Sequence, residues 1–305
     1  PRTALNMQTS RRRICSNIVL SCSLLVFLGQ LSYVTVMHTY HPRSLNHTGQ
    51  NNTEAIQQAR TSLIRNVEFF ITVTVKDRIN YVKLFAENLA WQNMSNRADV
   101  HVFDNGSRQF SAADLRTWFP HATIHSLDSL QDPDVATRRA FEYFIAESSI
   151  PILVNLDSDS LLHPEWASFV RKILPQSDGV LSLYHSAAPH HPTFNCSDVT
   201  CNKKTTGALG LVFHREVLKD ALEQVVESES VKQQGFDWAL CYYLTRMGKT
   251  IFVPLHSLIL HYGLHGAHGD GAGHVEVDKG FNLSHFPPTI RAQARFYAEN
   301  KFIVD

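Results

Sequence analysis

The sequence has no excess of charge of either sign, with 28 Lys and Arg residues against 28 Asp and Glu residues. A surface that binds nucleic acid needs a basic excess, so this balance argues against a nucleic acid partner. Internal repeats and low-complexity tracts are also absent from the sequence. The 305 residues have room for one large α/β domain and appended segments.

Cysteine is scarce, with five in the whole chain. Cys196 and Cys201 are close enough for a short-loop disulfide, which an oxidising compartment permits. A zinc site that uses nearby histidines is the alternative. Cys241 lies in a helical pattern and is predicted to be a buried free thiol.

Charged residues are missing from 14–37, a mostly apolar stretch that is long enough to span a bilayer as a helix. Arg11, Arg12 and Arg13 come just before it, so the positive-inside rule places the N-terminus in the cytosol. We therefore expect a cytosolic tail at 1–13, a signal anchor at 14–37, a stem at 38–66 and a lumenal domain at 67–305. A cleaved signal peptide is the alternative, but the run does not end in a small-residue cleavage site.

Acceptor sequences for N-glycosylation support a lumenal domain. Each alone is weak, but two of them fall in the polar segment directly after the apolar stretch, where a glycosylated stem would lie. The Asn-x-Ser/Thr sequences begin at Asn46, Asn51, Asn93, Asn105, Asn195 and Asn282.

From residue 67 the pattern alternates between strands and amphipathic helices. This alternation predicts an α/β fold with a mostly parallel central sheet that helices cover on both faces, and ligands then bind at the carboxyl ends of the strands. The expected strands are 67–75, 98–103, 122–127 and 150–156. The expected helices are 80–92, 111–118 with Ser111 as N-cap, and 133–147.

The segment 150–160, IPILVNLDSDS, is the most informative part of the sequence. It reads as a strand buried on both faces that delivers Asp157 and Asp159 to the sheet edge. Two carboxylates this close repel each other unless a cation lies between them, and hard oxygen ligands suit Mg²⁺ or Mn²⁺. Such an ion could hold a diphosphate. The alternative is a solvated turn that caps the next helix.

Two other strand ends carry polar residues. Asp104, in VFDNGS, could accept hydrogen bonds from a base or ribose, although Asn-Gly is also a favoured turn. Lys76, Asp77 and Arg78 follow the first strand, where a cation could meet a diphosphate. A surface charge cluster is the alternative.

Three later segments complete the candidate site. In TTGALGLVF, Gly207 allows close approach of the backbone to a ligand, although a structural turn would look similar. Asp237 begins a helix within 234–248, where it could act as a general base or simply as a cap. His261 ends an apolar segment and precedes a Gly- and His-rich loop with His265, and it is a candidate metal ligand or a structural histidine.

Taken in order, these segments resemble the GT-A class of nucleotide-sugar-dependent glycosyltransferases, closest in pattern to family two and its Golgi relatives. The resemblance covers roughly 67–274. It implies a Rossmann-like fold and an inverting transferase in which Asp104 contacts the nucleoside, Asp157 and Asp159 bind ribose and the metal–diphosphate, and Asp237 is the base.

The resemblance also makes His261, four residues after Ser257, a metal ligand, and it puts Arg138 near the donor. Two features depart from the family. Phe236–Asp237 stands where an acidic pair is common, and the Gln-x-x-Arg-Trp signature of processive synthases is absent. The single anchor and the missing signature favour transfer of one sugar.

The sequence therefore predicts a Golgi or ER type II membrane enzyme that uses Mn²⁺ or Mg²⁺. It would move one sugar from a nucleotide sugar, of the UDP class, to a hydroxyl of a glycan or glycoprotein, with inversion and with Trp238 and His265 in the acceptor pocket. A retaining transferase and an inactive sugar-binding or adhesion protein are the alternatives. A His-rich metallohydrolase would need a ligand spacing such as His-Glu-x-x-His, which the sequence lacks.

Overall fold

The computed structural model describes residues 67–127, 132–226, 235–263 and 279–299. The chain divides into two units, Pro1–Thr61 and Ser62–Asp305, and every described residue belongs to the second. The expected tail, anchor and stem (1–66) lie outside the described residues. Among the helices that are described, none has the length and apolar character needed to cross a membrane.

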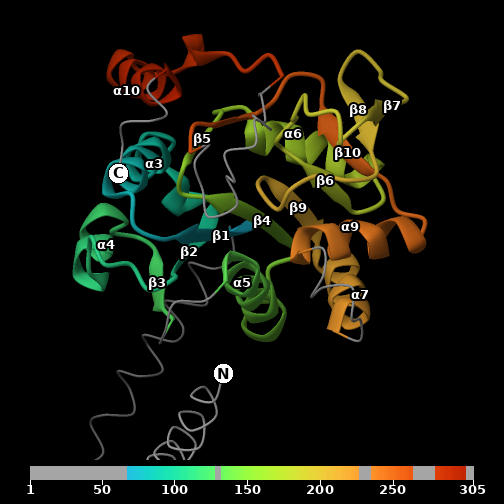
Figure 1. The fold of residues 1–305 in the computed structure, drawn as a ribbon, viewed down its shortest axis with the longest axis horizontal. Coiled ribbons are helices and arrows are strands. Elements are labelled where there is room, and N and C mark those ends of the chain that lie inside the picture. The colour runs from blue at the N-terminus through green and yellow to red at the C-terminus, as the bar shows by residue number, and fades with distance from the viewer. Residues whose placement is uncertain (1–66, 128–131, 227–234, 264–278, 300–305) are drawn as a thin grey trace, which may run out of the picture. The chain divides into compact units, whose positions relative to one another are not determined.

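A nine-stranded sheet forms the centre of this unit, in the order β3-β2-β1-β4-β9-β6-β10-β8-β7 (Figure 1). Its first part confirms the predicted parallel arrangement, because β1 pairs in parallel with both β2 and β4, and β2 with β3. Each strand lies within about two residues of its predicted range. These strands are β1 (Phe69–Val75), β2 (Ala98–Asp104), β3 (Thr123–Ser126) and β4 (Ile152–Asp157).

The second part of the sheet is mixed. β9 (Leu211–His214) is antiparallel to both its neighbours, β4 and β6 (Val180–Ser182). β10 (Ile251–Pro254) runs parallel to β6, and β8 (Thr200–Lys203) and β7 (Thr193–Phe194) continue antiparallel to the edge. Thus β9 and β8 oppose the other strands, and the sheet as a whole is mostly parallel as predicted.

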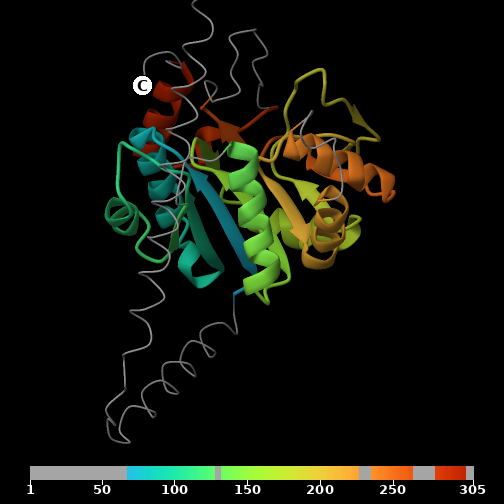
Figure 2. The same cartoon turned by 60° about the horizontal axis from the view of Figure 1, so that its bottom comes forward.

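Helices cover both faces of the sheet. Successive β1 side chains alternate between the faces, so Phe69 and Ile71 pack with α3, α4 and α6, whereas Phe70 packs with α5, α7 and α9. Figure 2 shows α5 lying against the central strands. These helices are α3 (Ile79–Trp91), α4 (Ala112–Trp118), α5 (Pro133–Glu147), α6 (Trp166–Ile173), α7 (Arg215–Val226) and α9 (Phe236–Arg246).

The predicted starts of α4 and α5 are confirmed, and each has a side-chain N-cap. Ser111 caps α4, because its hydroxyl accepts from the Asp114 amide and the Asp114 carboxylate accepts from the Ser111 amide. α5 spans the predicted range with Pro133 in its first turn, after Asp132 as N-cap.

A third apolar cluster lies above the carboxyl edge of β1. The two-stranded ribbon of β5 (Ser160–Leu162) and β11 (Ile259–His261) packs there with α3 and with α10 (Pro288–Glu299). Tyr262 is fully buried in it, with its ring 5.2 Å from the Tyr81 ring. The cluster fixes the ribbon that carries Ser160 opposite His261.

A histidine pair lies on the face of the sheet near α5. His101 Nδ1 and His125 Nε2 are 2.9 Å apart, and the Tyr143 ring lies 4.5 Å from the His125 ring. Asp99 lies beyond the pair, 3.2 Å from His101 Nε2. Burial, and then the neighbouring His101, lower the pKa of His125 to about 4.

Acidification should therefore destabilise the fold through His125. The unfolded chain takes up this proton near pH 6.5 but the folded chain only near pH 4, so stability is lost as pH falls through this window. His125→Phe keeps an aromatic ring and removes the proton, so its urea midpoint should fall less than that of the wild type between about pH 7 and about pH 5. The exposed His214→Phe is the matched control, and equal losses in both variants would contradict the assignment.

Candidate functional site

The predicted strand ends meet at one edge of the sheet. In the parallel register, Asp104 of β2 is opposite Val75 of β1, and Asp157 of β4 is opposite Thr74. The Asp104 side chain is buried, and its Oδ1 accepts from the Ser107 amide at 3.0 Å, so this carboxylate also shapes the VFDNGS turn.

The loop after β1 adopts a strained backbone. Asp77 and Arg78 both have left-handed φ angles, 49° and 55°, which cost about 1 kcal/mol or more for each side chain of this type. Asp77 holds the loop, because its Oδ1 accepts from the amides of Arg108 at 2.6 Å and Gln109 at 3.1 Å. In this backbone conformation, the Arg78 side chain reaches Asp159, just after the end of β4.

Arg78 forms the central ion pair of the site. Its Nη1 lies 2.7 Å from Asp159 Oδ2 and 3.4 Å from the Gly263 carbonyl oxygen. On the other side, His261 Nε2 lies 3.4 Å from Asp159 Oδ1. A Cβ added to Gly263 would overlap the Asp159 side chain, so only glycine permits this approach. Sequence analysis placed Arg78, Asp159 and His261 in one site but did not predict this ion pair.

The two carboxylates of the Asp-Ser-Asp turn have opposite pKa shifts. Burial, and then the neighbouring Asp159, raise the pKa of Asp157 to about 7, and Asp237 adds to this rise. Burial also acts to raise the pKa of Asp159, but His261 and Arg78 outweigh it and hold that pKa below its usual value. The two carboxylates therefore repel each other, and positive charge beside the turn would favour ionisation of both.

Carboxylate oxygens suit Mn²⁺ and Mg²⁺, and an imidazole nitrogen suits a transition metal, so the chemistry of Asp157, Asp159 and His261 fits Mn²⁺ better than Mg²⁺. Within the part of the chain that the structure describes, however, no three His, Cys, Asp or Glu side chains are grouped closely enough to hold an ion. In this arrangement the Arg78 guanidinium provides the positive charge beside Asp159.

Asp237 lies in the first turn of α9, as predicted, but it does not cap the helix. The N-cap is Gly235, and Asp134 of α5 accepts from the Phe236 amide at 2.8 Å. Asp237 Oδ1 accepts from the Trp238 amide at 2.7 Å. A Cβ on Gly207 would lie 3.8 Å from Asp237 Oδ2, so the two predicted site residues are neighbours.

Asn155 connects these two parts of the site, and sequence analysis did not identify it. Its Oδ1 accepts from Thr72 Oγ1 at 2.9 Å, and its Nδ2 donates to the Ala208 carbonyl at 2.9 Å. The glycine-rich segment is thereby bound to β4. The signal was a polar residue inside the apolar run of β4, two residues before the terminal Asp157.

Other predicted site residues lie apart from the carboxylates. Lys76 is exposed, and Arg138 Nε pairs with Glu142 at 2.8 Å on α5, so among the described residues neither contacts Asp157 or Asp159. Their proposed role toward a donor stays a prediction. Trp238 is exposed and stacks on His191, and His265 lies outside the described residues.

The predicted disulfide is confirmed: Cys196 and Cys201 are bonded, and Cys241 is a buried free thiol. Of the acceptor asparagines, Asn93, Asn195 and Asn282 are exposed, and Asn105 is buried. Asn46 and Asn51 lie outside the described residues. Glycosylation itself stays a prediction.

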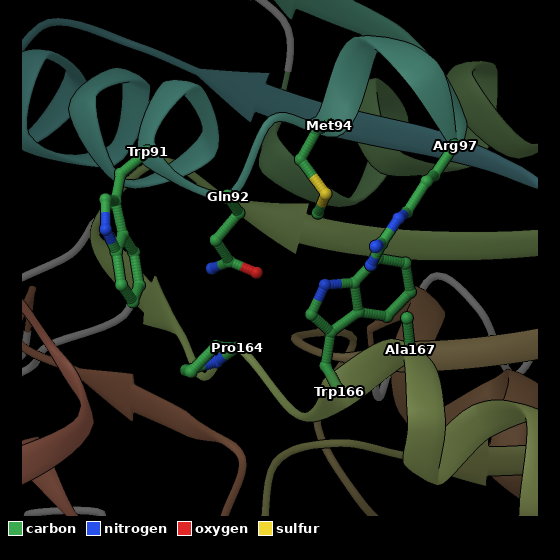
Figure 3. A pocket seen from close by; sticks show the side chains of 7 residues that line it. All are labelled: Trp91, Gln92, Met94, Arg97, Pro164, Trp166 and Ala167. Carbon is green, nitrogen blue, oxygen red and sulfur yellow. The ribbon is translucent and has the colours of Figure 1, made fainter.

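A separate pocket of about 270 Å³ lies near the opposite edge of the sheet (Figure 3). Arg97 lines the pocket just before β2, and its carbonyl oxygen accepts from the Phe69 amide at the start of β1. The pocket contains none of the predicted site residues. The lining residues are Trp91, Gln92, Met94, Arg97, Pro164, Trp166 and Ala167.

The chain matches no protein-family model and no curated protein sequence. Among solved structures it is similar to S. aureus TarS in complex with UDP-GlcNAc, with 14% identity and a TM-score of 0.46 over 61% of this chain and 56% of that one. It is also similar to the mannosyltransferase PcManGT from Pyrobaculum calidifontis in complex with GDP-Man and Mn²⁺, with 12% identity and a TM-score of 0.44 over 66% and 63% of the chains. The chain thus spans less than two thirds of either protein.

Replacing Gly263 should disturb Asp159 directly. In Gly263→Ala the new methyl group overlaps the Asp159 side chain, so we expect a loss of about 1–3 kcal/mol in unfolding free energy. Gly207→Ala is the control, because its methyl group meets Asp237 only at an ordinary contact distance. Urea unfolding measures both variants, and equal stability would show that the Gly263 contact is not restrictive.

Proposed function

We propose that this chain is a metal-dependent glycosyltransferase that moves one sugar from a nucleotide sugar, of the UDP class, to a hydroxyl group of a glycan or glycoprotein, with inversion at the anomeric carbon. One observation carries the proposal. Acidic residues from two separate segments, Asp157 and Asp159 on one and Asp237 on the other, influence one another at the carboxyl edge of a mostly parallel sheet, with His261 and Arg78 among them.

The donor would bind at the Asp-Ser-Asp turn. Asp157, Asp159 and His261 would hold Mn²⁺ or Mg²⁺, and the ion would supply positive charge that neutralises the departing diphosphate. The raised pKa of Asp157 supports this role, because a cation beside the turn would stabilise its ionised form. Asp104, at the neighbouring strand end, would contact the nucleoside.

Arg78 has two roles in this proposal. Without the ion it supplies the positive charge that Asp159 requires, through the ion pair at 2.7 Å. Were Asp159 to hold the ion, the Arg78 guanidinium could bind the diphosphate instead, and its planar fork of donors suits that role.

Asp237 would be the general base that takes the proton from the acceptor hydroxyl. Asp134 accepts from the Phe236 amide at the start of α9, and Asp237 uses Oδ1 for the Trp238 amide, so Asp237 Oδ2 is the oxygen that would take the proton. Gly207 has no side chain to block the space beside it. Attack on the side of the sugar opposite to the diphosphate would invert the configuration.

The cellular setting belongs to the same proposal. Residues 14–37 would anchor the chain in the Golgi or ER membrane as a type II protein, with the described domain in the lumen. The Cys196–Cys201 disulfide and the exposed Asn93, Asn195 and Asn282 are compatible with an oxidising, glycosylating compartment.

Two substitutions separate the proposed roles of metal binding and catalysis. Asp159→Asn should lose Mn²⁺-dependent release of UDP from UDP-sugars, by about 100-fold or more, because the main ligand is weakened. Asp237→Asn should lose transfer by about 100-fold or more but still bind UDP with Mn²⁺. Luminescent detection of UDP and calorimetry measure these effects, with the exposed Asp220→Asn as control.

The outcomes against the proposal are specific. Full activity in Asp159→Asn would remove the metal assignment, and full activity in Asp237→Asn would remove the base. Product NMR that shows the donor's anomeric configuration preserved would select a retaining mechanism on the same site.

Replacing Arg78 should have opposite effects on the two ligands. Arg78→Gln frees Asp159, so Mn²⁺ alone should bind about 10-fold more tightly, whereas UDP in the presence of Mn²⁺ should bind more weakly. Calorimetry with each ligand gives both affinities. Arg138→Gln is the control, since Arg138 pairs with Glu142 instead. Weaker binding of Mn²⁺ by Arg78→Gln would contradict competition between the guanidinium and the ion.

A further inference from the structure

The outer face of α9 exposes large side chains in a row. Trp238 and Tyr242 have 38% and 52% of their surface exposed, and Arg246 is exposed one turn further on. The spacing of four residues places all three on one side of the helix. We call Trp238, Tyr242 and Arg246 the α9 ridge.

The opposite face of α9 explains why the ridge is not part of the core. Phe236, Leu240 and Leu244 are buried against the sheet, so the helix has already satisfied its apolar stripe. Large exposed aromatic side chains beyond that stripe gain little for folding. Trp238 and Tyr242 are two of the six exposed large hydrophobic residues in the described part of the chain.

One face of the Trp238 ring packs on a buried histidine. Its ring stacks on the His191 ring with centroids 5.5 Å apart and planes 28° apart. His191 is buried, and its Nδ1 lies 3.0 Å from Thr205 Oγ1, which in turn donates to the His190 carbonyl. A rigid aromatic ring loses little conformational entropy on binding a ligand.

Tyr242 continues the ridge. The Arg246 guanidinium lies 5.8 Å from the centre of the Tyr242 ring, a cation–π distance. Residues four apart on a helix are separated by about 6 Å along its axis. This separation is close to the length of one sugar residue in an oligosaccharide, so neighbouring sugars could reach Trp238 and Tyr242 in turn.

The ridge begins at the proposed base. Trp238 directly follows Asp237 on α9, and its amide donates to Asp237 Oδ1 at 2.7 Å, so the ridge starts at the residue after the proposed base. A pyranose has an apolar face of C–H groups and a rim of hydroxyl groups, and it needs an aromatic surface next to hydrogen-bonding groups. Trp238 and Tyr242 provide the surface, and the Tyr242 hydroxyl and Arg246 provide donors.

We propose that the α9 ridge binds the acceptor as an oligosaccharide of at least two sugar residues. The sugar that receives the transfer stacks on Trp238, and the next sugar stacks on Tyr242. This inference rests on the proposed function, and it names the acceptor class as an extended glycan instead of a monosaccharide or an unglycosylated peptide.

Binding alone tests the ridge, without any turnover. We would titrate the purified full chain with mannotetraose, chitotetraose and cellotetraose and with mannose, N-acetylglucosamine and glucose, using saturation-transfer NMR. At least one tetrasaccharide should bind more tightly than its monosaccharide. Tyr242→Ala should weaken that tetrasaccharide about 10-fold and leave the monosaccharide unchanged, whereas Trp238→Ala should weaken both.

Phe296→Ala is the matched control, because Phe296 of α10 is also 52% exposed. It should leave every affinity unchanged. Circular dichroism melting of the three variants detects any loss of folding, and Tyr242→Phe, which keeps the ring, should retain most of the binding. Absence of binding for all three tetrasaccharides, or equal effects of Tyr242→Ala and Phe296→Ala, would overturn the proposal.

The result separates this inference from the proposed function. If the tetrasaccharide binds through Tyr242 but no nucleotide sugar supports transfer, the ridge stands and the transferase assignment fails. If transfer occurs with the same KM for a monosaccharide and its tetrasaccharide in wild type and Tyr242→Ala, the transferase stands and the ridge fails.

Discussion

The repulsion between Asp157 and Asp159 is the constraint that organises the site. Two carboxylates at one strand end are costly to ionise together, and the structure answers with positive charge from elsewhere in the chain. Arg78 reaches Asp159 from the loop after β1, although its backbone must adopt a left-handed conformation to do so. His261 approaches the same carboxylate from β11. The local strain is therefore offset by electrostatic stabilisation at this one point.

The order and pairing of the strands bring these residues together. Parallel pairing of β1 with β2 and β4 brings three loops to one edge. The β5–β11 ribbon, packed under α10 and against α3, then adds the His261 segment from the other end of the sequence. On the far side of the edge, Asn155 joins the Ala208 carbonyl to β4 and so brings the glycine-rich segment toward Asp237. Asp159, His261 and Asp237 are thus positioned by different elements: the end of β4, the β5–β11 ribbon, and α9 beside the glycine-rich segment.

Local patterns were enough to predict the first half of the fold. Strands with apolar runs and helices with clear caps, such as α4 and α5, were predicted close to their observed bounds, because their signals lie within a few neighbouring residues. The short strands β5, β6 and β11 have no periodic signal, because they form only by pairing with strands that are distant in the sequence. The Arg78–Asp159 pair joins residues 81 positions apart, and the cap of α9 comes from Asp134, 102 positions away. No local pattern contains such contacts.

That remote cap joins α5 and α9 at one hydrogen bond. Gly235 has a φ of 88° and lies so close to the Asp134 carboxylate that a Cβ there would approach it to 3.0 Å. The first turn of α9 therefore takes its position from a different helix, and Asp237 takes its position from that turn. In evolutionary terms, residues 134, 235 and 237 form an epistatic set: a change at one alters which residues are tolerated at the other two, even though only Asp237 would face a substrate.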